Sequence, residues 1–236
     1  MQRGPGTLYV VATPIGNLDD LSPRALRVLS EVPVLACEDT RRTGMLLKRL
    51  GVVRAERRYL AYHEHNEVRV APRIVSLLRD GLDVALVTNA GTPLVSDPGY
   101  RLVAAARREG LPVVPIPGPC AAIAALCASG LPTDRFTFLG FLPARASARA
   151  RVWADLREDR GTCIFYVPAR SLERALVELS GVHPDARVVV ARELTKVFEE
   201  FVCGTPEGCL QALRSRRPRG EVTLLVHRGA RKPDAP

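Results

Sequence analysis

Short apolar runs and amphipathic segments alternate along most of the chain. The apolar runs are rich in Val, Ile, Leu and Ala, and the segments between them repeat apolar residues every three or four positions. Strands in the first half are predicted at residues 7–13, 33–37, 82–88 and 111–116. Helices are predicted between and after them at 21–32, 43–51, 67–81 and 100–110. This alternation is typical of a mostly parallel sheet covered by helices on both faces.

The second half has a similar pattern with shorter connections, which indicates a mixed sheet. A Pro- and Gly-rich turn at Pro117 and Gly118 leads into a helix of small residues near 121–131. Predicted strands follow at 135–141, 162–167, 186–193, 196–204 and 220–227, with helices at 144–159, 171–181 and from 205. We therefore expect two α/β domains, residues 1–117 and 118–236, the second ending in a frayed basic tail.

Composition places the chain among globular proteins. It has 236 residues, of which 47% are hydrophobic and 25% charged. The N-terminus lacks the pattern of a secretory signal, and the apolar helix near 121–131 is shorter than the roughly 20 residues of a membrane span. We expect a cytoplasmic protein without a membrane partner. The six cysteines form no C-x-x-C pair, which favours free, mostly buried thiols and no metal site.

The chain is basic, with 34 Lys and Arg against 25 Asp and Glu and a formal net charge of +9. Such a balance permits a polyanionic partner such as RNA, although solvated basic surfaces alone can account for it.

Each of the four predicted strands in the first half is followed by a polar turn. The last of these turns also precedes the small-residue helix. They read "TPIGN", "EDTRRTG", "TNAGTPLVSDPG" and "PGPCAA". Ligands of open α/β sheets collect beyond the carboxyl ends of the strands, so these turns are expected to line a site. No phosphate-binding glycine motif and no nucleophile elbow occurs in the chain. The turns suit an uncharged or cationic ligand better than a triphosphate.

The order and wording of these segments resemble the tetrapyrrole methylase superfamily, which uses S-adenosylmethionine. Within it the chain resembles the branch that methylates the ribose 2′-hydroxyl of a cytidine in 16S ribosomal RNA of the small subunit. The matching stretches are "GTLYVVATPIGNLDDLSPRAL", "CEDTRRTGMLL", "HEHNE", "NAGTPLVSDPGYRLV", "VVPIPGPCAAIAAL", "SGLPTDRFTFLGFLP", "VVVARELTK" and "GEVTLLV".

The resemblance implies that S-adenosylmethionine lies between the two domains. Cys120 and Ala121 would offer backbone amides to its carboxylate at a helix N-terminus, and Tyr166 and Ala191 would close the adenine side. The positions assigned to the cofactor are Pro14, Ala90, Gly91, Thr92, Val95, Cys120, Ala121, Tyr166 and Ala191. The chain departs from the family pattern at Asn89, where an Asp is usual, and at Val167, where a Glu is usual.

A ribose hydroxyl is a weak nucleophile, so methyl transfer favours a group that accepts its proton. The candidates by type are Glu38, Asp39, His63 and His65, and Asp39 with Arg41 is preferred because "EDTR" follows a strand directly. Alternatively, Glu38 and Asp39 pair with Arg41 or Arg42 and organise the loop. Two histidines beside Glu64 and Glu67 could also hold a metal ion, but hydrogen bonding is the more usual role of such a loop.

RNA binding needs phosphate contacts from basic side chains. The candidates are Arg41, Arg42, Arg145, Arg149, Arg151 and the arginines of 214–219. The partner implied by the resemblance is small-subunit ribosomal RNA or the assembled subunit, bound by a homodimer. Two other functions stay open: a small-molecule methyltransferase acting on a tetrapyrrole, and a non-catalytic RNA-binding module.

Overall fold

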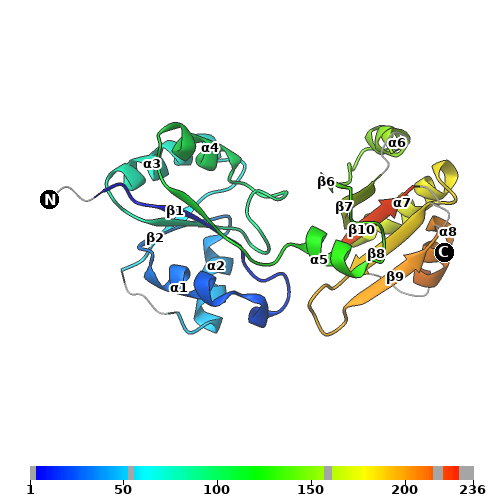
Figure 1. Ribbon diagram of the computed structural model, residues 1–236, viewed down its shortest axis with the longest axis horizontal. Coiled ribbons are helices and arrows are strands. Elements are labelled where there is room, and N and C mark those ends of the chain that lie inside the picture. Colours follow the sequence, from blue (N-terminus) through cyan, green and yellow to red (C-terminus); the bar gives the residue numbers. More distant parts are fainter. Residues whose placement is uncertain (1–3, 53–55, 157–160, 215–219, 229–236) are drawn as a thin grey trace. The chain divides into compact units, whose positions relative to one another are not determined.

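A computed structural model describes residues 4–52, 56–156, 161–214 and 220–228. The chain divides into two compact units, Met1–Cys120 and Ala121–Pro236, which are described separately (Figure 1). This division falls three residues after the 117/118 boundary expected from the sequence. The expected frayed tail lies almost entirely outside the described residues, as do all but Arg214 of the arginines of 214–219.

Unit 1 is built on a parallel sheet. Its five strands have the order β3-β2-β4-β1-β5, and all four neighbouring pairs are parallel. The strands are β1 (Leu8–Val11), β2 (Val34–Cys37), β3 (Arg58–Ala61), β4 (Val84–Val87) and β5 (Val113–Ile116). The α/β class with a parallel first sheet is confirmed. Strand β3 was not predicted, because as an edge strand it buries only Leu60.

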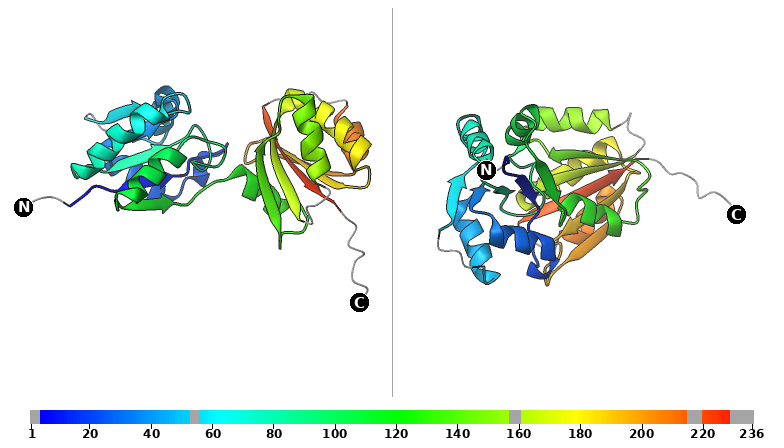
Figure 2. Two further views of the ribbon diagram at one scale, coloured as in Figure 1. Left: turned by 90° about the horizontal axis from the view of Figure 1, so that it is seen from above. Right: turned by 60° about the vertical axis from the view of Figure 1, so that its left-hand side comes forward.

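Helices cover both faces of this sheet (Figures 1 and 2). They are α1 (Pro23–Glu31), α2 (Thr40–Arg49), α3 (Glu67–Arg79) and α4 (Tyr100–Arg108), with a short 3₁₀ helix at Leu18–Asp20. Alternate strand residues face opposite layers: Leu35 and Val87 pack with α1 and α2, whereas Ala36 and Leu86 pack with α3 and α4. The near-continuous apolar strands thus reflect burial on both faces.

Capping residues fix where the first two helices begin. Ser22 accepts a hydrogen bond from the backbone N–H of Ala25, and Pro23 occupies the first helical position, as predicted. Asp39 caps α2, so this helix begins at Thr40, three residues before the start predicted from its apolar spacing. Since Asp39 also follows β2, strand and helix are joined by very few residues at the carboxyl edge of the sheet.

Unit 2 has a mixed sheet, as expected. Its order is β6-β7-β10-β8-β9, in which β6 and β7 are parallel and the other pairs antiparallel. The strands are β6 (Phe136–Phe141), β7 (Thr162–Pro168), β8 (Arg187–Arg192), β9 (Glu200–Gly204) and β10 (Glu221–His227). The strand predicted at 196–204 begins only at Glu200, because Glu193 and Thr195 adopt positive φ in a turn that precedes it.

The core of unit 2 lies between this sheet and α6 (Ala146–Asp155), α7 (Ala169–Val182) and α8 (Pro206–Leu213). Trp153 and Phe165 meet edge to face there, with ring centroids 5.6 Å apart. Helix α5 (Ala121–Ala128) contacts β7 and β10. None of the described helices is long and apolar enough to cross a membrane.

All six cysteines are free thiols. Cys37, Cys163 and Cys209 are buried, Cys120 is half-buried, and Cys127 and Cys203 are exposed, so burial is less general than expected.

Candidate functional site

The turns that follow β1, β4 and β5 meet in unit 1. The backbone N–H of Thr13 donates to the carbonyl of Gly91 over 2.8 Å, and the N–H of Gly91 donates back to Thr13 over 3.0 Å. The Thr92 hydroxyl donates to the carbonyl of Pro119 over 2.9 Å. These contacts bring together five of the six cofactor residues expected in this unit: Pro14, Ala90, Gly91, Thr92 and Cys120.

The loop after β4 is held in an unusual conformation. Leu94 and Ser96 have φ of 73° and 61°, a backbone region that residues other than glycine rarely adopt. Gly91 has φ of 82°, and an added Cβ would lie 3.5 Å from Ile15. Val95, the remaining cofactor candidate of this loop, donates its N–H to Thr92. A loop so constrained is suited to form a preorganised wall for a flexible ligand.

Strand order divides the carboxyl edge of the sheet into two halves. The expected cofactor turns follow β4, β1 and β5, which are neighbours, and the expected catalytic turns follow β2 and β3, which continue the sheet on the other side of β4. Glu38 connects the halves, since its Oε2 accepts a hydrogen bond from the backbone N–H of Asn89 over 3.1 Å. The loop after β4 is therefore part of both the cofactor half and the catalytic half of the sheet edge.

The Asp39 carboxylate forms the N-terminal cap of α2. Its Oδ1 accepts hydrogen bonds from the N–H groups of Arg41 and Arg42 over 2.8 and 3.2 Å. Hydrogen bonds from the backbone of Arg42 and Arg41 lower the pKa of Asp39 below its ordinary value. A carboxylate with a lowered pKa is a weaker base at neutral pH, so this geometry supports a loop-organising role for Asp39. Asp39 performs it by capping the backbone, and the expected ion pairs with Arg41 or Arg42 do not occur among the described residues.

His63 is oriented by Asn66. The Asn66 Oδ1 accepts from the His63 backbone N–H, and its Nδ2 donates to the carbonyl of Ala61, which fixes the direction of the amide. Nδ2 also lies 3.1 Å from Nε2 of His63. Because Nδ2 can only donate, we assign Nε2 as the acceptor and place the proton of the neutral ring on Nδ1. His63 is thus arranged as a hydrogen-bond donor rather than as a proton acceptor.

His65 is exposed, and its ring lies edge-on to His63 with centroids 6.0 Å apart. Within the described parts of the chain, no group of three or more His, Cys, Asp or Glu side chains is arranged to hold a metal ion.

Three buried polar atoms at this edge have no hydrogen-bond partner among the described residues: Nδ1 of His63, Oγ1 of Thr88 and Oδ1 of Asn89. Register places all three just beyond the aligned strand ends Ala61, Cys37 and Val87. Buried polar atoms normally have a partner, so unmet donors and acceptors that gather at one edge indicate a place for a bound molecule or ordered water.

In unit 2 the expected cofactor residues lie in one row across the sheet. Tyr166 on β7 and Ala191 on β8 both pair with Thr223 of β10, which is buried between them. The Tyr166 hydroxyl accepts a hydrogen bond from the N–H of Ala122 over 3.2 Å, which joins the row to the first turn of α5 beside Ala121. The sequence analysis did not single out Thr223, although its stretch "GEVTLLV" was among the matching segments.

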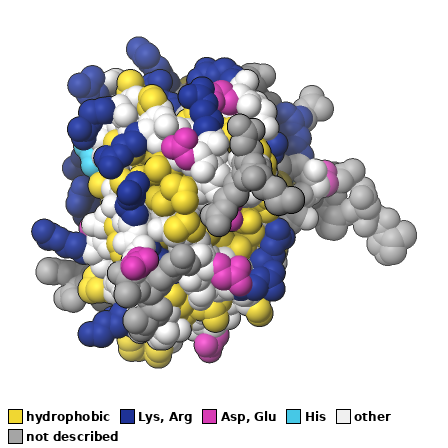
Figure 3. Space-filling view, turned by 90° about the vertical axis from the view of Figure 1, so that its left-hand side faces the viewer, with side chains coloured by type: hydrophobic (Ala, Val, Ile, Leu, Met, Phe, Trp, Pro, Cys, Tyr) yellow, Lys and Arg dark blue, Asp and Glu magenta, His cyan; other side chains and the backbone are white. Residues whose placement is uncertain are grey.

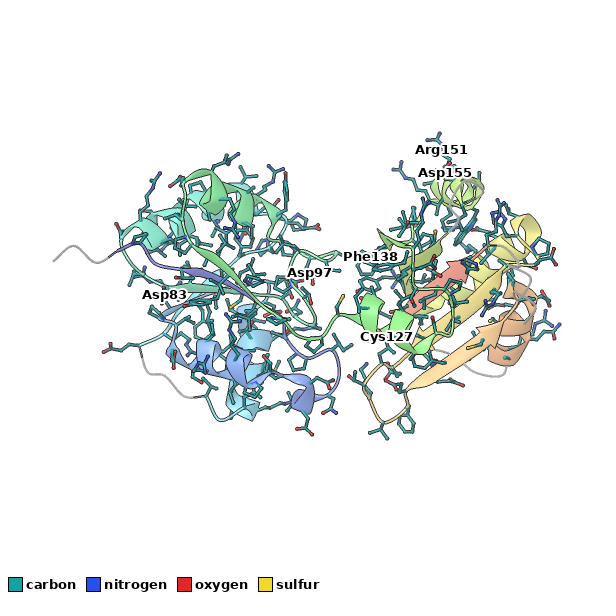
Figure 4. All side chains as sticks on the ribbon, viewed as in Figure 1. Asp83, Asp97, Cys127, Phe138, Arg151 and Asp155 are labelled. Atoms are coloured by element: carbon teal, nitrogen blue, oxygen red, sulfur yellow. The ribbon has the colours of Figure 1, made fainter. Side chains whose placement is uncertain are left out.

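Two phenylalanines surround Tyr166. The rings of Phe138 and Phe141 on β6 meet it edge to face, with centroids 4.9 and 5.5 Å apart (Figure 4 labels Phe138). Aromatic and small residues thus line the row, which suits a purine ring.

The departures from the family pattern lie in different environments. Val167 is fully buried in the core of unit 2, so it faces the layer opposite to Tyr166. Asn89 lies beside Glu38 and contributes its backbone N–H to the site.

The RNA-contact candidates separate into exposed and buried residues. Arg41, Arg42, Arg145 and Arg151 are exposed, and Arg151 projects from α6 with Asp155 (Figure 4). Arg149 is only 4% exposed. Its guanidinium donates to both oxygens of Glu178 over 2.7 and 2.8 Å and to two backbone carbonyls, so its donors are used inside unit 2 and it is removed from the RNA set.

Basic side chains are prominent on the surface. On the face shown in Figure 3, Lys and Arg side chains gather along the upper and left margins, with hydrophobic side chains among them. Polyanions are attracted to such a surface at long range.

A family model described as "Tetrapyrrole (Corrin/Porphyrin) Methylases" matches residues 7–208. A ribosomal RNA small subunit methyltransferase I of Xylella fastidiosa is 48% identical over 238 residues, covering 98% of this chain and 84% of the relative. The enzyme of the same name from Pseudomonas aeruginosa is 49% identical over 225 residues, covering 94% and 78%.

Solved structures share the fold at low sequence identity. A diphthine synthase matches with a TM-score of 0.70 at 16% identity, covering 94% of this chain and 90% of that one. A cobalt precorrin-4 methyltransferase matches with a TM-score of 0.65 at 19% identity, covering 94% of both.

Proposed function

The chain belongs to the tetrapyrrole methylase family, and we propose that it methylates the ribose 2′-hydroxyl of a cytidine in 16S ribosomal RNA of the small subunit. It is a methyltransferase that uses S-adenosylmethionine and acts on small-subunit ribosomal RNA. The RNA substrate is supported by the 48% identity, over nearly the whole chain, with a relative named for that activity.

The residues of both units fit the cofactor. In unit 1 the constrained loop after β4 offers backbone groups near Gly91 and Thr92, and in unit 2 the first turn of α5 adjoins Tyr166. Free N–H groups of a helix N-terminus suit the carboxylate of the ligand, and the aromatic residues around Tyr166 suit its adenine. S-adenosylmethionine supplies an activated methyl group on a sulfonium.

The role of the protein is to position the ribose and to receive its proton. Glu38 is our candidate acceptor. One of its oxygens is held by Asn89, whereas Oε1 makes no hydrogen bond with the described residues. Asp39 positions the turn as a helix cap, and His63 donates from Nδ1 to an oxygen of the substrate. Holding the reacting oxygen in line contributes much of the acceleration in such reactions.

We also propose phosphate contacts from Arg41, Arg42, Arg145 and Arg151, a homodimer, and a cytoplasmic location. The exposed positions of these arginines support the contacts, and the family resemblance supports the dimer and the location.

The test is transfer of a labelled methyl group from S-adenosylmethionine to three acceptors: small ribosomal subunits that lack the modification, naked ribosomal RNA, and a reduced tetrapyrrole. The proposal expects label in RNA of the subunits or of the naked preparation. Label confined to the tetrapyrrole would contradict it, and cofactor binding without transfer would favour a non-catalytic RNA-binding protein.

A further inference from the structure

The outer surface of α2 carries only basic and neutral side chains. No acidic residue occurs from Thr40 to Arg49, and the buried side of the helix is formed by Thr43 and Leu47. The opposite side exposes five residues, here called the α2 basic face: Arg41, Arg42, Met45, Lys48 and Arg49. The spacing of these residues follows the helical repeat, so they form one continuous stripe.

Asp39 attracts Arg41 and Arg42 electrostatically, but the α2 basic face has no close carboxylate partner among the described residues. None of its four basic side chains forms an ion pair with a residue that the structure describes, whereas Arg79, Arg101, Arg149, Arg192 and Lys196 all do. Met45 lies among them and is 57% exposed. A cationic stripe without internal ion pairs is complementary to a polyanion.

Gly44 interrupts α2 in a way that packing within the chain does not explain. A glycine inside a helix destabilises the helix relative to alanine. An added Cβ at Gly44 would meet nothing within 4 Å, so the described residues leave room for a side chain. Gly44 lies three residues after Arg41 and four before Lys48, so it forms a notch flanked by two cations.

Helix α2 begins beside the proposed site. Because Asp39 caps α2 directly after β2, the first turn of the helix lies at the carboxyl edge of the sheet, beside Glu38. From Arg41 to Lys48 the helix extends about 10 Å away from that edge. Tyr59 on edge strand β3 pairs with Leu35, which places it on the side of the sheet that α2 covers, and it is 40% exposed.

We propose that the α2 basic face guides the RNA strand away from the site, with a phosphate seated in the Gly44 notch between Arg41 and Lys48 and a base against Met45 or Tyr59. This inference rests on the proposed function, since it assigns a docking surface to the same RNA substrate. The absence of a side chain at Gly44 lets the sugar-phosphate backbone approach the helix closely, and the flanking cations neutralise it.

The experiment compares Gly44→Ala with Gly181→Ala in the full-length protein. Gly181 lies in α7, is exposed, and likewise has nothing within 4 Å of an added Cβ. Both substitutions favour the helix and are expected to raise the melting temperature by about 1–3 °C. Only Gly44→Ala is expected to raise KM for small ribosomal subunits, by about fivefold or more, with the Kd for S-adenosylmethionine unchanged.

Salt dependence provides a second readout. Lys48→Ala should reduce the slope of log Kd for a 16S RNA fragment against log salt concentration by roughly 0.7–0.9, the release expected for one phosphate contact. Arg24→Ala and Arg27→Ala remove exposed cations from α1 and should leave the slope nearly unchanged.

Unchanged KM in Gly44→Ala together with an unchanged salt slope in Lys48→Ala would overturn the proposal. Loss of a dimer in Lys48→Ala, measured by sedimentation, would also overturn it, because α2 would then be a contact between copies. If the wild-type protein transfers no methyl group to RNA, the proposed function fails. The direct RNA-binding comparison still decides whether the α2 basic face binds RNA.

Discussion

The carboxylate of Glu38 accepts a hydrogen bond from the backbone N–H of Asn89 over 3.1 Å, which ties the end of β2 to the loop that follows β4. This contact links the half of the sheet edge assigned to the cofactor with the half assigned to the substrate. It also leaves the second carboxylate oxygen of Glu38 without a hydrogen bond to the described residues.

If Glu38 receives the ribose proton, Glu38→Gln should lower kcat for RNA methylation by about 10²-fold or more, because general-base catalysis typically contributes that much. The amide oxygen can still accept from Asn89, so the loop and the Kd for S-adenosylmethionine should be retained. Single-turnover methyl transfer with saturating subunits measures the effect. A kcat within twofold of wild type would exclude this role.

Asp39 is expected to act as a cap and not as the base. Asp39→Asn keeps a good capping residue, so both kcat and melting temperature should stay close to wild type. Asp39→Ala removes the oxygen that accepts from Arg41 and Arg42 and should lower the melting temperature. The two variants are compared by thermal denaturation and by methyl transfer. A large loss of kcat in Asp39→Asn at unchanged stability would show that the charge itself takes part.

The tautomer of His63 can be observed directly. Nitrogen NMR of the labelled imidazole at neutral pH should show a proton on Nδ1 and none on Nε2, because Nε2 faces the amide donor of Asn66. Asn66→Asp replaces that donor by a carboxylate and should move the proton to Nε2. The opposite tautomer in the wild-type protein would contradict the orientation assigned to Asn66.

Arg149 is expected to stabilise unit 2 and not to bind RNA. Arg149→Ala leaves Glu178 without its guanidinium and should cost about 3 kcal/mol in the free energy of unfolding, whereas exposed Arg151→Ala should change it by less than about 0.5 kcal/mol. Urea denaturation measures both variants. Equal stabilities of the two variants would contradict the structural role of Arg149.

The same ion pair predicts a pH dependence of stability. The hydrogen bond from Arg149 holds the pKa of Glu178 below its ordinary value of 4.5. A carboxylate with a lowered folded-state pKa stabilises the protein above its unfolded pKa, and that contribution is lost as the pH falls through the folded value. Glu178→Gln should therefore be less stable than wild type at pH 7, and the difference should shrink towards pH 3. A difference independent of pH would exclude the linkage.

Much of this fold could be predicted from local patterns, since apolar strands buried on both faces and capped helices carry strong signals. Ser22 with Pro23 marked the start of α1 correctly. Strand β3 was not predicted, because three of its four residues are exposed and its sequence therefore resembles a polar loop. The turn at Glu193 and Thr195 was not predicted, because its positive φ angles occur at residues other than glycine, which rarely adopt them.

Site residues were harder to assign, because the role of a charged side chain depends on partners distant in the sequence. Arg149 resembled its neighbours Arg145 and Arg151, and only the approach of Glu178 from α7 distinguishes it as a core residue. Asp39 resembled a catalytic base, whereas the amides of its own helix explain its lowered pKa. Thr223 has no local signature and gains significance only from its place between Tyr166 and Ala191.

The central claim is tested most directly by nucleoside mass spectrometry of small-subunit ribosomal RNA. The RNA is taken from subunits that lack the modification, before and after incubation with the wild-type protein and S-adenosylmethionine. We predict one new 2′-O-methylcytidine per RNA, with the methyl group on the ribose fragment. A methyl group on a base, on another nucleoside, or on no RNA at all would contradict the account.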